Sequence, residues 1–132
     1  MILTSGSTSI TLNDDLRWLD QQWSGIVEER NYGLADGSNP APVISHRNSR
    51  AGRPMSLSST SDLFGCIQYS VFSALVALAA TNPSSMSLVA YGSTFAVAFR
   101  YDEQPVSGEP VLGVTRYAGD EWWTVKINLI QV

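Results

Sequence analysis

The chain contains one lysine, one cysteine and one histidine among its 132 residues. A single cysteine excludes an internal disulfide, and the apolar neighbours Phe64 and Ile67 predict that Cys66 is a buried core thiol. A zinc site needs about four Cys, His or acidic ligands close together, and the sequence has no such cluster. His46 lies in a polar stretch beside Arg47, far from Cys66 in the chain, so we predict an exposed loop histidine and no Cys–His catalytic pair.

Charge is also scarce. Charged residues make up 15% of the chain, and the net charge is -4, whereas about a quarter of residues are charged in an average globular domain. There is no run of Lys and Arg residues, which argues against a dedicated nucleic-acid-binding protein and leaves DNA only as passing cargo. A weakly charged surface favours subunit contacts, because few charges lose water on association. The alternative is an ordinary monomer of low charge.

Targeting and catalytic signals are missing as well. The N-terminus has no basic region of the kind that opens a signal peptide, and the longest apolar run, over residues 71–80, is too short to span a bilayer. We therefore expect cytoplasmic synthesis and no membrane insertion. Adjacent carboxylates such as Asp14-Asp15, Glu28-Glu29 and Asp102-Glu103 point to opposite faces of a strand and make poor acid–base pairs. Without a nucleotide-binding motif either, we expect no enzymatic activity, no cofactor, and no catalytic or metal-binding residue.

What the sequence does contain is alternating β-type patterning over a single domain, residues 1–132. The alternation predicts strands at residues 7–12, 87–91, 94–101, 111–117 and 122–132, with weaker signals at 26–30, 43–46 and 55–57. A helix is predicted over residues 71–80, with Ser70 as N-cap and Asn82-Pro83 as its end. Polar loops are predicted at 31–42 and 102–109. These elements indicate an α+β, mainly β fold: an antiparallel β-sandwich or small barrel with one packed helix.

Two groups of side chains are candidates for contacts. Trp18 and Trp23 carry a large apolar surface within six positions, which serves either core packing or a partner pocket. Arg50 and Arg53, in a Gly-containing arginine-rich stretch, either bridge carboxylates of an adjoining subunit or belong to a solvated loop.

Three segments carry a resemblance to a known class of proteins. They are D-D-L-R-W-L-D at residues 14–20, R-A-G-R-P-M-S-L at residues 50–57, and the C-terminal part, with G-S-T-F-A-V-A-F-R at 92–100 and W-x-V-x-I-x-L at 123–129. Together they resemble small distal tail and baseplate proteins of long-tailed, siphovirus-like phages or prophages. The resemblance covers most of the chain, its motifs are structural, and agreement is poorest at residues 36–42.

The resemblance implies a virion structural protein of the tail, assembled in the host bacterial cytoplasm. It implies a homo-oligomeric ring, six-fold or alternatively three-fold, with the tail tube, tape-measure and hub proteins as partners. On this hypothesis the interface residues are Trp18, Trp23, Arg50, Arg53 and Trp122. Alternatives are a tail terminator or head–tail connector protein, and a glycan- or receptor-binding module that uses Trp122 and Tyr117.

Overall fold

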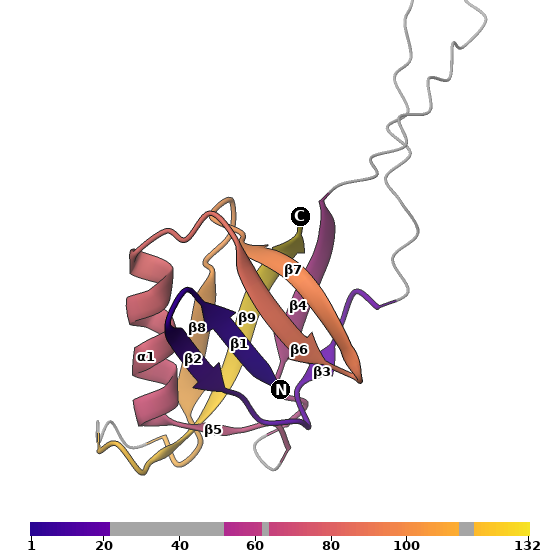
Figure 1. Cartoon of the computed structure of the whole chain (residues 1–132). Coiled ribbons are helices and arrows are strands. Elements are labelled where there is room, and N and C mark those ends of the chain that lie inside the picture. Colours follow the sequence, from indigo (N-terminus) through magenta and orange to yellow (C-terminus); the bar gives the residue numbers. More distant parts are fainter. Residues whose placement is uncertain (22–51, 62–63, 114–117) are drawn as a thin grey trace, which may run out of the picture.

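The computed structural model describes residues 1–21, 52–61, 64–113 and 118–132. They form one antiparallel sheet and one helix (Figure 1). In chain order the elements are β1 Ile2–Ser5, β2 Thr8–Thr11, β3 Arg17–Trp18, β4 Arg53–Ser58, β5 Ile67–Gln68, α1 Tyr69–Ala80, β6 Met86–Ala90, β7 Ser93–Phe99, β8 Val106–Pro110 and β9 Trp122–Gln131. The predicted fold class, mainly antiparallel β with one helix, is confirmed.

Strand β9 organises the sheet. Along one edge it pairs with β4 and then β5, and along the other with β7 and then β8. From β7 the sheet continues through β6 and β1 to β2, and beyond β4 it ends at β3. The described strands therefore form one continuous open sheet, and neither a two-sheet sandwich nor a closed barrel is confirmed.

The sheet curls around a single hydrophobic core. Figure 1 shows β1 and β6 passing in front of β9, and side chains of both halves join one apolar cluster. Leu3, Leu88, Ile127 and Leu129 are all 0% exposed. Burial of each such side chain contributes about 1.5–3 kcal/mol before conformational entropy is counted. Strict alternation along these strands leaves every second side chain on the outer face of the sheet.

The helix covers one opening of the curl, where it contacts β2, β5, β8 and β9. Leu75, Leu78 and Ala79 are buried, while Val71 and Phe72 pack against the core from its rim. These positions recur at the three- and four-residue spacing of one helical face. The helix predicted from that spacing is confirmed, and it begins two residues earlier than expected.

The N-cap predicted at Ser70 is wrong. The N-cap is Gln68, which makes no side-chain capping bond, and Ser70 lies inside the first turn. The backbone N–H groups of Tyr69 and Ser70 instead donate to the carbonyls of Glu121 and Gly119 at 2.8 and 3.1 Å. The turn before β9 thus caps the helix from a distant part of the chain, which no local capping signal can reveal.

At its other end the helix stops where the sequence predicts. Thr81 is the C-cap, Asn82 adopts a left-handed φ of 49°, and Pro83 follows. The Tyr101 hydroxyl donates to the Ala79 carbonyl at 2.6 Å, and the Thr81 hydroxyl donates to the Leu78 carbonyl at 2.7 Å. The same two carbonyls also accept the backbone N–H groups of Asn82 and Thr81, each at 3.1 Å, so the hydroxyls are second donors at the end of the helix.

Three predictions for the C-terminal half differ from the structure. The β6–β7 turn lies at Tyr91 and Gly92, one residue before the position that the predicted strands 87–91 and 94–101 leave for it. Both residues have positive φ (51° and 73°), as a two-residue hairpin turn requires. The predicted loop at 102–109 contains strand β8 from Val106 onward. The predicted strand at 111–117 is wrong in its described part, because residues 111–113 form a turn.

Asn128 lies on β9 between the part that pairs with β7 and the part that pairs with β8. It is a polar residue of the central strand, 3% exposed. Its backbone carbonyl accepts from Arg100 N–H, its N–H donates to the Pro105 carbonyl, and its side-chain Nδ2 donates to the Gln104 carbonyl at 2.8 Å. One buried residue therefore anchors both ends of the connection between the two strands.

Candidate binding surfaces

The outer face of β2, β1, β6 and β7 carries no ionisable side chain. In register, Thr11, Ile2, Val89 and Thr94 form one row across the strands, and Ser9, Thr4, Ser87 and Ala96 form the next. Ala98 extends β7 on the same side. We call these nine residues the uncharged face.

Within the uncharged face, apolar groups are exposed in the middle of a sheet. Ile2 is 41% exposed and Val89 is 44% exposed, and they pair directly. Their neighbours are threonines, serines and alanines, which are short side chains that leave the face nearly flat. At its corner Arg100 forms ion pairs with Asp102 at 2.9 Å and Glu103 at 3.1 Å.

The Arg100 cluster is internal to the chain. Its hydrogen bond to Asp102 raises the pKa of Arg100, and the same bond lowers the pKa of the Asp102 carboxyl. Carboxylates such as Asp102 and Glu103 could pair with arginines of another copy, but in this structure both face Arg100 of their own chain. The cluster holds the loop that leads from β7 toward β8, and its one cation and two carboxylates leave a net charge of -1 beside that corner of the uncharged face.

Trp18 lies in the core. It is 7% exposed, meets Phe95 edge-on at 5.6 Å and stacks with Tyr91 at 6.3 Å between ring centroids. The Arg53 guanidinium lies over its ring at 4.5 Å and donates to the Gln21 carbonyl. The structure therefore favours the core-packing interpretation of Trp18. The Arg53 guanidinium packs on the Trp18 ring and shields it from solvent.

The same cluster holds Tyr91 in place. Its hydroxyl donates to the Leu16 carbonyl at 2.6 Å. Burial is the largest effect on the phenol and raises its pKa above the ordinary value of 10.0. Strand β3 and the β6–β7 turn, distant in sequence, are joined through this contact and the ring stack.

The outer face of β8, β9 and β4 is different in character, because a polar groove of about 580 Å³ runs over it. Lys126 is exposed on β9 and lies in register between Ser58 of β4 and Ser107 of β8. Thr124 lies opposite Glu109, and its hydroxyl donates to the Glu109 carbonyl at 3.2 Å. We call this feature the Lys126 groove.

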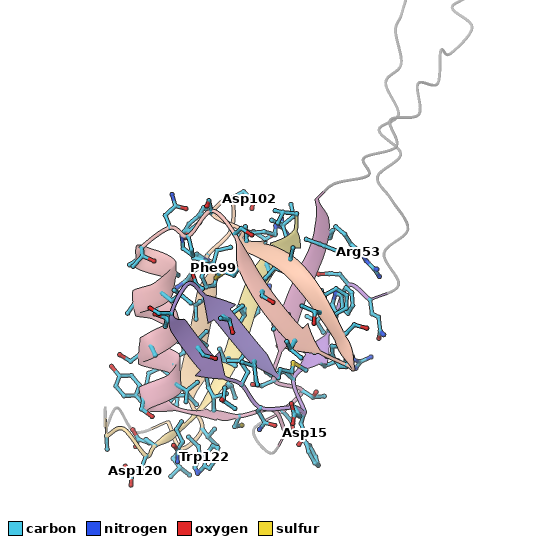
Figure 2. The ribbon with its side chains drawn as sticks, in the orientation of Figure 1. Asp15, Arg53, Phe99, Asp102, Asp120 and Trp122 are labelled. Carbon is cyan, nitrogen blue, oxygen red and sulfur yellow. The ribbon has the colours of Figure 1, made fainter. Side chains whose placement is uncertain are left out.

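Trp122 lies on the same side of β9 as Thr124 and Lys126, because alternate residues of a strand share a face. It is 53% exposed, while the adjacent Trp123 turns inward and stacks with Phe72 at 5.0 Å. Figure 2 shows Trp122 beyond the lower end of the sheet, near Asp120. Of the predicted interface residues that the structure describes, Trp122 is the one with a widely exposed ring.

The remaining candidate residues are either buried in the core or lie outside the described residues. Cys66 is buried, as predicted, at 8% exposure. Trp23, Arg50, His46 and Tyr117, like the predictions for residues 26–30, 31–42 and 43–46, lie outside the described residues. The signal that sequence reasoning missed is the pair of serines beside Lys126, which come from strands far apart in the chain.

Residues 1–21, 52–61, 64–113 and 118–132 contain no group of three or more His, Cys, Asp or Glu arranged to hold a metal ion. Over the same residues, no helix has the length and apolar character needed to cross a membrane. The chain matches no family model, no curated protein and no solved structure.

Proposed function

We propose that this chain is a structural subunit that works by assembling with copies of itself and with neighbouring proteins, at the tail tip of a long-tailed phage. The observation that carries the assembly proposal is the uncharged face. A chain of net charge -4 presents nine outward side chains in four adjacent strands without an ionisable group. The place in the tail rests on the sequence resemblance alone.

Two copies of an acidic chain repel each other least where they meet through an uncharged face. Burial of a charged group without a partner costs several kcal/mol, whereas Ile2 and Val89 gain about 25 cal/mol for each Å² of apolar surface that they bury. Serine and threonine hydroxyls rotate to find partners across an interface. The face therefore combines a small apolar gain with little desolvation cost.

The size of the face limits what it can do alone. The four strands are 4, 4, 5 and 7 residues long. At a spacing of about 4.8 Å they cover roughly 300 Å², compared with about 800 Å² per partner in a standard interface. A stable assembly must therefore bury surface beside the face as well. In a ring each copy meets its neighbours through two different surfaces, which supplies that extra area.

In the tail, the proposed assembly is a ring, six-fold or alternatively three-fold, that links the tail tube to the hub or receptor-binding components. The tape-measure protein is a further partner, and DNA passes only as cargo. An acidic lumen would repel the duplex and keep it moving. A tail terminator or head–tail connector would use the same kind of ring.

The test is the assembled mass of the purified chain by native mass spectrometry, with electron microscopy of the same sample. The proposal predicts a ring with a copy number that is a multiple of three, and the same protein in purified virions. A chain that remains a monomer at all concentrations and is absent from particles would contradict it. Localisation at the head end of the tail would instead identify the terminator or connector alternative.

A further inference from the structure

The Lys126 groove contains a cation that forms no ion pair with any described residue. Among the described residues, no carboxylate lies within ion-pairing distance of Lys126, and its neighbours across the strands are Ser58 and Ser107. The Ser58 hydroxyl donates to the Ser59 carbonyl at 3.1 Å, so the Lys126 ammonium and the Ser107 hydroxyl are the donors that can meet one anionic group. It is the only lysine of the chain.

The rest of the groove rejects a polyanion. Glu109 lines the same groove and lies diagonal to Lys126, since it pairs with Thr124, two positions away on β9. Diagonal neighbours on a sheet are about 7–8 Å apart. A ligand with a row of negative charges would therefore meet Glu109 as well as the net charge of the chain. Hydroxyl donors, in contrast, find an acceptor in the same carboxylate.

The aromatic part of this surface is Trp122. It lies four positions before Lys126 on the same side of β9, which places the two backbones about 13 Å apart. That separation matches about three linked sugar rings. An exposed indole presents a flat apolar face with a polar edge, and a pyranose ring can stack on it.

We propose that the Lys126 groove, together with Trp122, binds a short oligosaccharide that carries an isolated carboxylate. The carboxylate pairs with Lys126 between Ser58 and Ser107, and a sugar ring further along stacks on Trp122. Sugar hydroxyls bond to Glu109 and to the hydroxyls of the groove. This site is independent of the uncharged face, which lies on the outer side of other strands.

The test is isothermal titration of the purified chain with 3′-sialyllactose and with 6′-sialyllactose, each a trimer of sugar rings with a single carboxylate. Their methyl esters, which have the same skeletons without charge, are the matched control ligands. Lys126→Gln should weaken binding of the acidic trimers by roughly tenfold or more, the effect of one charge-assisted hydrogen bond. Arg17 lies in the same row on the far side of Ser58, so Arg17→Gln should weaken binding less than Lys126→Gln; an equal or larger loss would contradict the assignment of the carboxylate to Lys126.

Trp122→Ala should weaken both charged and esterified trimers, because stacking does not depend on the carboxylate. The masses of the same variants by native mass spectrometry separate this proposal from the assembly proposal. Loss of assembled mass in Trp122→Ala without loss of affinity would make Trp122 a subunit contact and overturn the assignment. Absence of binding to either trimer, or equal binding of tetraglutamate, would also overturn it.

Discussion

Gly108 should be the least replaceable glycine among the described residues. A Cβ atom at this position would lie 2.4 Å from the Thr124 carbonyl oxygen and 2.8 Å from Cε2 of Phe72. Both distances are below the 3.0 Å that Cβ atoms respect in proteins. The first obstacle is backbone of the neighbouring strand and the second is a ring on α1, so Gly108→Ala must push both β9 and the helix outward.

The cost follows from overpacking. Forcing a methyl group into a filled site destabilises a protein by about 1–3 kcal/mol, and the rigid carbonyl places Gly108→Ala at the upper end. For a domain of this size the melting temperature should fall by roughly 5–15 °C. Differential scanning calorimetry measures the change directly.

Gly119→Ala is the matched control, because its Cβ would meet only Ser70 Cβ, at an ordinary 3.8 Å. It should change stability by less than about 0.5 kcal/mol. Adding Phe72→Ala to Gly108→Ala should give a double variant less destabilised than the two single changes together, since one of the two clashes is removed. An unchanged melting temperature for Gly108→Ala would refute the packing argument between α1, β8 and β9.

Two further predictions concern buried polar contacts. Asn128→Ala removes the donor to the Gln104 carbonyl and should destabilise the chain by about 1–3 kcal/mol; an unchanged urea midpoint would contradict its anchoring role. Burial raises the pKa of Tyr91 and of Tyr101 above 10.0. The neutral phenols therefore contribute their full stability below pH 10. This stability is lost as the pH rises through the raised pKa values. Tyr91→Phe should show a smaller alkaline loss in melting temperature and a lower stability at neutral pH, because the Leu16 carbonyl loses its donor; a steeper alkaline loss would contradict this.

Local patterns predicted the elements whose signal is continuous in sequence. Strand β9 alternates from Trp123 to Leu129, and α1 shows a helical face ending at Asn82. Strand β8 was not predicted because Gly108 and Pro110 are typical of loops. Its pairing with β9 outweighs that local preference. Strand β1 is only four residues long and is held by long-range pairing with β6.

The surfaces were harder to foresee than the elements. The alternation in β7 separates Phe95, Val97 and Phe99 from their outward neighbours, and the sequence shows this alternation directly. That Ile2 would pair with Val89 depends on which strands become neighbours, and no local pattern encodes it. The burial of Trp18 follows equally from long-range contacts with Tyr91 and Phe95.

Assembly through the uncharged face is tested most directly by two matched lysine substitutions. Val89 on the face is 44% exposed, and Val76 on α1 is 42% exposed, so Val89→Lys and Val76→Lys place the same charge at equally exposed valines. Exposed substitutions of this kind change stability little, and circular dichroism verifies that both variants are folded. Native mass spectrometry should find Val76→Lys assembled like the unmodified chain and Val89→Lys reduced to smaller species. Equal masses for the two folded variants would contradict the account.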